Sequence, residues 1–215
     1  MEQLILTEYT HPKYKNDDYI ISSSNSLAYK VAMNFPSTDY MPLLIMGPKH
    51  SGKSFLLNLW RANKDAFLID DISKFDFRNT SARLIAIDDI DKIKDEDSLF
   101  HLFNFCQQED IALLMTATDY NNFVLKDLSS RIKSTKLVRL TRPDDAMVRI
   151  FIAKHCSDIG LKIPNNILTF AASHLERDFV AIKHFIALLN KQSLNFNKKI
   201  SLELVRQMIF SLQKQ

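Results

Sequence analysis

The residues from 43 to 54 have the types and the spacing that bind phosphate groups. Four apolar residues, 43–46, predict a buried strand, and the pattern Gly-x-x-x-x-Gly-Lys-Ser follows at 47–54. Gly47 and Gly52 permit positive φ angles and a close approach of the backbone to an anion. The amides of the loop and of the helix that follows present partial positive charge. The pattern therefore predicts a phosphate-binding loop between a strand and a helix.

The side chains of this loop have separate expected roles. Lys53 would reach the β- and γ-phosphates of a nucleotide, and the Ser54 hydroxyl would coordinate Mg²⁺. The chain has only three glycines, and the loop contains two of them. The residues expected to contact the nucleotide here are Gly47, Pro48, Lys49, His50, Ser51, Gly52, Lys53, Ser54 and Phe55. We therefore expect ATP or ADP, with Mg²⁺, as the ligand.

Two acids follow a later apolar run. Residues 84–87 are apolar, and Asp88 and Asp89 come directly after them. Ligands bind at the carboxyl edge of parallel strands in open α/β folds, so both carboxylates would lie at that edge. We expect Asp88 to hold Mg²⁺, directly or through water, and Asp89 to polarise the attacking water. An acidic pair after a strand can also be a solvated loop, but the phosphate loop upstream favours the catalytic interpretation.

The next predicted strand, 111–115, also ends in polar residues. Thr116, Thr118 and Asp119 follow it. A polar side chain at this strand end could orient water against the γ-phosphate, and we prefer Thr118 to the other two. The alternative is that these turn-forming residues only terminate the strand.

The elements that position these residues alternate between strand and helix. Helices are expected before the first strand, after the phosphate loop, from Asp97 or Ser98 through Cys106, and over 122–133. The five expected strands are 43–46, 66–69, 83–87, 111–115 and 136–140. Alternation of this kind predicts an α/β fold, with a parallel sheet between two layers of helices.

The character of the chain changes after the fifth strand. Asp144 and Asp145 can cap a helix that runs through Ser157, and Gly160 stands where a left-handed residue is expected after a helix end. Three further helical stretches follow, at about 165–175, 178–192 and 201–213. We therefore expect three parts: an N-terminal tail over 1–12, a nucleotide-binding domain over 13–158, and a small all-helical lid domain over 159–215.

Composition excludes several other classes of protein. The 215 residues carry a net charge of +3, and 46% of them are hydrophobic. This charge is too small to indicate a nucleic-acid surface, and the basic residues are not concentrated. Cys106 and Cys156 lie in apolar helical patterns, as buried thiols of a reducing compartment do. No apolar run is long enough to span a bilayer, and the N-terminus lacks a secretory signal, so we expect a cytoplasmic protein.

The order of these motifs resembles the AAA+ ATPases, and most closely their DnaA group of replication initiators. The leading helix with Asn25 and Ala28, and the segment Leu-Ser-Ser-Arg-Ile at 128–132, are similar to that group. DnaA continues into a helix-turn-helix DNA-binding domain, whereas this sequence ends after the lid. In that respect it is similar to the Hda-like regulators, which inactivate DnaA. The resemblance implies no sequence-specific DNA binding and no membrane association.

The resemblance also implies two contacts with partner proteins. Arg131 would be an arginine finger that acts on ATP held by DnaA. Gln3, Leu4 and Leu6 are similar to the short motif with which Hda-like proteins bind the replication sliding clamp. In such a motif the glutamine amide orients the peptide, and the two leucines fill an apolar groove.

One expected lid residue departs from the family pattern. The family places an arginine near the start of the helix at 178–192, where this sequence has Val180. Arg177, about one helical turn earlier, would take its place at the nucleotide. The sequence therefore leaves open whether the chain's own site hydrolyses ATP, whether ATP or ADP is the resident nucleotide, and whether the chain forms a homo-oligomer. The alternatives to a DnaA regulator are an autonomous ATPase, such as a helicase loader, and a nucleotide-dependent adaptor.

Overall fold

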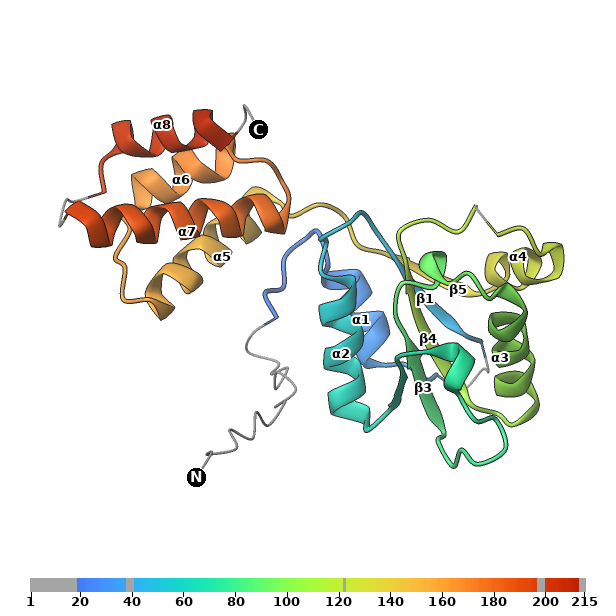
Figure 1. Ribbon diagram of the computed structural model, residues 1–215. Helices are drawn as coiled ribbons and strands as arrows, with labels where there is room; N and C mark the ends of the chain where they lie inside the picture. Colours follow the sequence, from blue (N-terminus) through green and yellow to red (C-terminus); the bar gives the residue numbers. More distant parts are fainter. Residues whose placement is uncertain (1–18, 38–40, 122, 197–199, 213–215) are drawn as a thin grey trace, which may run out of the picture.

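A five-stranded parallel sheet and a separate bundle of helices make up the molecule. The computed structural model describes residues 19–37, 41–121, 123–196 and 200–212. The tail over 1–12, with the expected clamp motif, lies outside them. The α/β part and the bundle lie side by side, connected by the chain between β5 and α5 (Figure 1). No described helix combines the length and the apolar character needed to cross a membrane.

The sheet confirms the predicted fold class. Its strand order is β2-β3-β4-β1-β5, and all its pairs are parallel. Met46 at the end of β1 pairs with Ala117, and Ile87 at the end of β3 pairs with Met115. The ends of these three neighbouring strands therefore meet at one edge of the sheet. The strands are β1 (Leu43–Met46), β2 (Phe67–Ile69), β3 (Leu84–Ile87), β4 (Ala112–Ala117) and β5 (Lys136–Arg139).

Helices cover both faces of the sheet, because alternate strand residues point to opposite sides. Leu43 and Ile45 pack in one core with Trp60, whereas Leu44 packs in the other with Leu102. On the first face lie α1 (Ser26–Met33) and α2 (Lys53–Lys64), and on the second lie α3 (Glu96–Gln108) and α4 (Lys126–Lys133). Two short 3₁₀ helices, η2 (Ile72–Lys74) and η3 (Ile90–Lys92), follow β2 and β3.

The helical bundle has a core of its own. It consists of α5 (Asp145–Asp158), α6 (Asn165–His174), α7 (Phe179–Phe196) and α8 (Leu202–Leu212). Ile152 of α5 packs in one buried cluster with Ile182 and Val205. Helix α5, which the sequence predicted at the end of the domain over 13–158, thus packs with α6, α7 and α8. Gly160 has the expected left-handed backbone, with φ of 73°.

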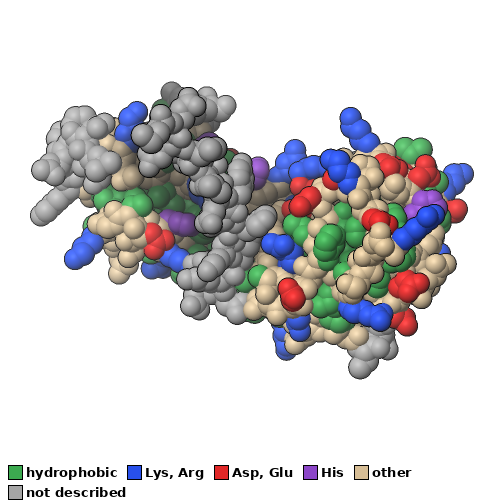
Figure 2. All heavy atoms as spheres, turned by 60° about the horizontal axis from the view of Figure 1, so that its bottom comes forward, with side chains coloured by type: hydrophobic (Ala, Val, Ile, Leu, Met, Phe, Trp, Pro, Cys, Tyr) green, Lys and Arg blue, Asp and Glu red, His purple; other side chains and the backbone are tan. Residues whose placement is uncertain are grey.

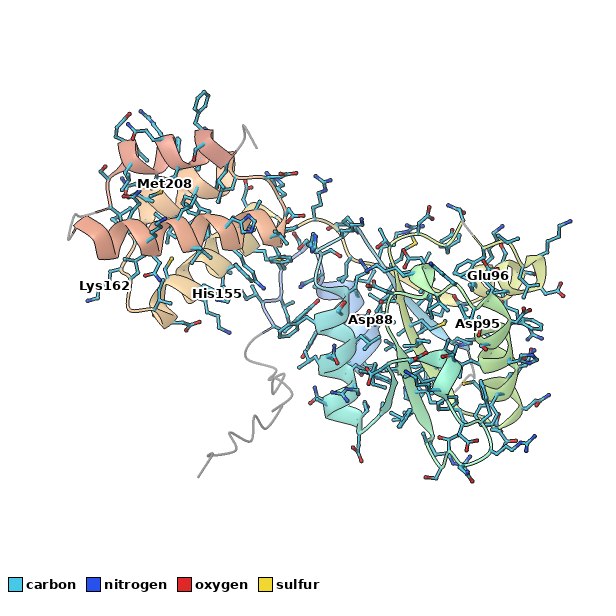
Figure 3. The ribbon with its side chains drawn as sticks, in the orientation of Figure 1. Asp88, Asp95, Glu96, His155, Lys162 and Met208 are labelled. Carbon is cyan, nitrogen blue, oxygen red and sulfur yellow. The ribbon has the colours of Figure 1, made fainter. Side chains whose placement is uncertain are left out.

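Two helix starts differ from those expected. Asp95 caps α3, where Asp97 or Ser98 was expected, since its carboxylate accepts both the amide and the hydroxyl of Ser98, at 3.0 and 2.7 Å. The next helix, α4, begins only at Lys126, because the Glu96 carboxylate accepts the amides of the two residues before it. Asp95 and Glu96 lie together at the start of α3 (Figure 3).

Candidate nucleotide-binding site

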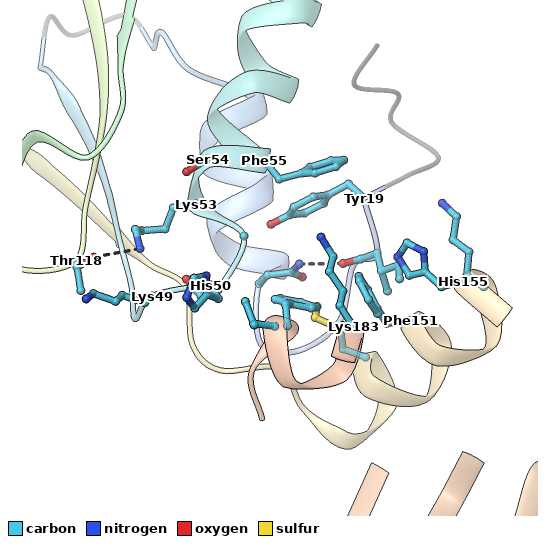
Figure 4. A pocket seen from close by; sticks show the side chains of 18 of the residues that line it. Tyr19, Lys49, His50, Lys53, Ser54, Phe55, Thr118, Phe151, His155 and Lys183 are labelled. Atoms are coloured by element: carbon cyan, nitrogen blue, oxygen red, sulfur yellow. Dashed lines mark hydrogen bonds between the residues drawn. The ribbon is translucent and has the colours of Figure 1, made fainter. Parts of the chain in front are cut away.

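A cavity of about 820 Å³ lies where the α/β domain meets the lid (Figure 4). Three segments form its walls. The phosphate loop and the start of α2 form one wall, helices α5 and α7 form another, and the third is residues 19–25, which precede α1 and which we call the strap. The loop and the lid helices are far apart in the sequence, so tertiary structure alone brings these walls together.

The phosphate loop turns sharply into α2. Gly52 directly precedes α2 with φ of 92°, a left-handed conformation that favours glycine. Gly47 is close to other backbone: a Cβ atom there would lie 2.6 Å from the carbonyl oxygen of Leu140. The Ser51 hydroxyl is buried and has no hydrogen-bond partner among the described residues. A narrow loop with an unsatisfied buried hydroxyl fits a ligand that carries oxygen atoms.

Lys53 is the first residue of α2, and its side chain is almost fully buried. Its Nζ donates to the carbonyl oxygens of Gly47 and Pro48, at 2.9 and 3.0 Å, and to Oγ1 of Thr118 at 3.4 Å. Burial lowers the pKa of Lys53, and the carboxylates of Asp89, Asp91 and Asp88 oppose that shift. A buried ammonium group held by carbonyl dipoles is suited to bind phosphate oxygens.

The two acids after β3 have different surroundings. Asp89 lines the cavity, and its carboxylate pairs with Lys92 on η3. Asp88 accepts hydrogen bonds from the Asp89 amide at 3.1 Å and from the Thr116 hydroxyl. Thr116 also accepts from the Asp89 amide, at 2.8 Å. Thr116 therefore orients the acidic pair, whereas Thr118 is the threonine that reaches Lys53 and the cavity.

Sequence analysis did not predict most of the lid residues that line the cavity. Phe151 of α5 and Phe179 of α7 line the cavity, and Lys183, one helical turn after Phe179, faces it (Figure 4). Val180, where the family resemblance predicts an arginine, lines it as well. Spacings of three to four residues along α5 and α7 could have marked these faces, but only tertiary structure shows what the faces meet.

Arg177 is not among the residues that line the cavity. Its guanidinium forms an ion pair with Asp145 on α5, with an N–O distance of 2.7 Å, and both side chains are about half exposed. Arg177 as a nucleotide ligand therefore stays a prediction from the resemblance alone.

Arg131 lies on α4, on the other face of the sheet from the phosphate helix, and is not among the residues that line the cavity. Its guanidinium donates to Oε1 of Gln107 and lies over the ring of Phe100, 5.9 Å from the ring centroid. Both partners belong to α3, so two contacts define the direction of this side chain.

The side chains of the cavity match the two parts of a nucleotide. Lysines and histidines outnumber acids: the cationic or ionisable set is Lys49, His50, Lys53, Lys92, Lys154, His155 and Lys183, against Asp89 and Asp158. Aromatic rings provide an apolar wall, with Tyr19 stacked 5.6 Å from Phe55. A base would fit against the rings, and phosphates would fit against the loop and Lys53.

Comparison with solved structures identifies this architecture as the AAA+ fold. Domain III of DnaA from Thermotoga maritima superposes with a TM-score of 0.75 at 18% identity, over 95% of this chain and 99% of that domain. AMPPCP-bound DnaA from Aquifex aeolicus gives 0.68 at 21% identity, over 85% and 67% of the two chains. The RuvB Holliday junction branch migration motor of Thermotoga maritima gives 0.66 at 16% identity, over 86% and 66%.

Sequence comparison relates the chain to DnaA in particular. The chromosomal replication initiator protein DnaA of Wolinella succinogenes is 24% identical over 93% of this chain and 52% of its own length. DnaA of Lactiplantibacillus plantarum is 27% identical over 94% of this chain and 51% of its own length. This chain is thus similar in sequence to DnaA over nearly all of its own residues, and it spans about half the length of these relatives. No protein-family model matches it.

Proposed function

We propose that the cavity binds ATP or ADP together with Mg²⁺. The observation that carries this proposal is Lys53, whose buried ammonium group is held between the phosphate loop and the acids after β3. Ser54 and Asp88 would hold Mg²⁺ jointly with phosphate oxygens, and the ion would neutralise phosphate charge. That DnaA with the same fold has been solved with bound AMPPCP also supports a nucleotide ligand.

The chain's own residues around Lys53 would also handle an attacking water. Asp89 would polarise this water, and Thr118, held by Lys53, would orient it. Because Val180 occupies the position of the family's lid arginine and Arg177 pairs with Asp145, we expect hydrolysis here to be slow.

We further propose that this DnaA-related chain promotes hydrolysis of ATP on DnaA and thereby limits replication initiation. Arg131 would supply the finger, and its place outside the chain's own cavity suits a residue that acts on a neighbour. Gln3, Leu4 and Leu6 would tether the chain to the sliding clamp, which raises its concentration near replicating DNA. This tether rests on the sequence alone, since these residues lie outside the described part.

A second candidate is an autonomous ATPase that uses its own site as a motor. Asp89 and Thr118 already stand in the cavity close to Lys53, and a RuvB branch migration motor shares the fold. Turnover by the purified chain separates the two: brisk ATPase activity without any partner favours the motor, and negligible activity favours the regulator.

The deciding experiment measures ATP hydrolysis by DnaA in the presence of clamp-loaded DNA and the purified chain. We expect wild type to stimulate hydrolysis, and Arg131→Ala to lose at least about 90% of that stimulation while still binding nucleotide. Deletion of residues 1–6 should abolish both clamp binding and stimulation. Lys133→Ala, an exposed cation on the same helix, is the matched control. Equal stimulation by wild type and Arg131→Ala would reject the finger.

Nucleotide binding is tested separately, by titration with a fluorescent ADP. Lys53→Ala should weaken binding at least about a hundredfold, because a charged partner of the phosphates is lost. Failure of wild type to bind either ADP or ATP at millimolar concentration would refute the nucleotide site itself.

A further inference from the structure

The carboxylate of Asp144 connects the strap to the lid. Asp144 is the N-cap of α5, and its Oδ1 accepts the amide of Met147 at 2.7 Å. Its Oδ2 accepts the hydroxyl of Ser23 at 2.6 Å and the amide of Ser24 at 3.2 Å. One oxygen therefore holds the first lid helix, and the other holds the strap.

The strap is also fixed to the α/β domain. The Asn25 side chain donates to the carbonyl oxygen of Ile20 and accepts from the amide of Ser22, both at 2.9 Å, which fixes the turn before α1. The ring of Tyr19 stacks on Tyr29 of α1 at 5.4 Å, and on the α2 residue Phe55. Asp144 thus joins the lid to a segment that is packed on the α/β domain.

Both sides of this connection reach the cavity. Tyr19, Ile20 and Asn25 line it from the strap, and Met147 lines it from α5. Asp144 itself does not line the cavity. It therefore lies outside the cavity and links the strap to α5.

The hydrogen bonds to Asp144 have a charged carboxylate as their acceptor. Partial burial alone would raise the pKa of this carboxyl. Hydrogen bonds from Met147 on α5 and from the strap residues Ser22, Ser23 and Ser24 nevertheless leave its pKa below the ordinary value. These bonds have an ionised acceptor, and such bonds are about twice as strong as neutral ones.

We propose that Asp144 is a positioning residue that holds the lid against the strap and so sets the rate at which the cavity releases its nucleotide. The proposal rests on the nucleotide binding proposed above. A bound nucleotide would contact both walls, and a lid freed from the strap would move away from it and open a path for release.

The test measures release of N-methylanthraniloyl-ADP from the full chain, chased with excess ADP. In Asp144→Asn the new residue still caps α5, because asparagine is a good N-cap, but its amide nitrogen cannot accept from the strap. We expect release about tenfold faster than in wild type, since hydrogen bonds to a charged acceptor are lost. Ser23→Ala should accelerate release by a smaller factor, about threefold.

A double-mutant cycle separates positioning from general destabilisation. Both Ser23→Ala and Asp144→Asn remove the hydrogen bond that the Ser23 hydroxyl donates to Oδ2 of Asp144, so the double variant should release ADP no faster than Asp144→Asn alone. Asp95→Asn is the matched control: Asp95 also caps a helix and accepts a serine hydroxyl and amide, but it lies on α3 outside the cavity lining. Its release rate should equal that of wild type.

Three outcomes would overturn the proposal while leaving nucleotide binding intact. They are a wild-type release rate in Asp144→Asn, equal acceleration by Asp95→Asn, and additive effects of Ser23→Ala and Asp144→Asn on the release rate. Should Asp144→Asn fail to fold, Ser23→Ala decides, because Ser23 is exposed and its truncation leaves the cap intact. If wild type binds no labelled ADP, the proposed nucleotide site fails, and that result is distinct from all three.

Discussion

At the residue scale, the glycines of this chain differ in what an added methyl group would meet. At Gly47 a Cβ would lie 2.6 Å from the Leu140 carbonyl oxygen and 2.9 Å from Ser51 Oγ, so backbone must shift. At Gly52 the nearest atom is 4.0 Å away, and only the φ of 92° opposes a side chain. The cost at Gly47 is therefore steric, and the cost at Gly52 is conformational.

We predict that Gly47→Ala lowers the free energy of unfolding by about 2–3 kcal/mol, and that Gly52→Ala lowers it by about 1–2 kcal/mol. Urea denaturation of each variant measures these losses of unfolding free energy. Titration with ADP should show weaker binding in both variants. Gly160→Ala is the control, because φ there is 73° and no atom lies within 4 Å of the added Cβ. It should cost about 1–2 kcal/mol and leave ADP affinity unchanged. A Gly47 variant as stable as the Gly160 variant would contradict the packing described here.

Local spacing explains which site residues were predictable. The phosphate loop and the acidic pair after β3 are each a short run of adjacent residues, which sequence patterns can reveal, and the structure brings Lys53, Asp89 and Thr118 to one cavity. Tyr19 and Lys183 escaped prediction because each lies in an ordinary amphipathic or polar stretch, and only the meeting of strap, loop and lid gives it a role. Arg177 could not be placed from sequence, since the pattern contains no sign of its pairing with Asp145.

At the element scale, periodicity predicted the strands and helices but not every partner. Three of the four buried residues of α5, Val148, Ile152 and Cys156, recur every four positions and mark a buried face. That pattern is equally compatible with packing on the sheet or on other helices, so periodicity alone could not predict that α5 packs with α6, α7 and α8. The start of α3 was misplaced for a related reason: Asp95 and Asp97 are both good N-caps, and only the contacts of Ser98 decide between them.

Helix α4 depends on a cap from another helix. Its N-cap position is Leu125, which provides no side-chain hydrogen bond, and the Glu96 carboxylate on α3 accepts the amides of Val124 and Leu125 at 3.0 and 2.7 Å. We predict that Glu96→Ala lowers the free energy of unfolding by about 1–2 kcal/mol and speeds hydrogen exchange in α4 specifically. The exposed Asp97 lies on the same turn, and Asp97→Ala should cost no more than about 0.5 kcal/mol. Comparable losses in the two variants would show that only the α3 helix dipole is involved.

At the scale of the whole molecule, the site lies between two separately packed bodies. The α/β domain has cores on both faces of its sheet, and the lid has a third core that shares no residue with them. On the face of the α/β domain seen in Figure 2, acidic and basic side chains are interspersed, so no single sign of charge dominates there. Lysine and histidine side chains line the cavity instead, so anions are attracted mainly to the junction of the two bodies.

Each body contains one cysteine, and the two thiols can report on the bodies separately. Cys106 is buried in α3, and Cys156 is buried in α5. Burial raises the pKa of Cys106 to about 12 and that of Cys156 to about 11. Because the thiolate is the reactive form, both thiols should react with a disulfide reagent at pH 8 at least about a hundredfold more slowly in the folded chain than in urea.

We predict that the two thiols respond differently when the lid core is weakened. In a Cys106→Ala background, Val205→Ala in the lid core should speed labelling of Cys156, since the cavity it creates costs about 1–3 kcal/mol of lid stability. In a Cys156→Ala background, the same substitution should leave labelling of Cys106 nearly unchanged, because Cys106 belongs to the core beneath α3. Saturating ADP should slow labelling of Cys156, since a ligand that contacts both bodies opposes opening of the lid. If Val205→Ala accelerates both thiols equally, the chain unfolds as one cooperative unit, and the lid cannot open independently of the sheet.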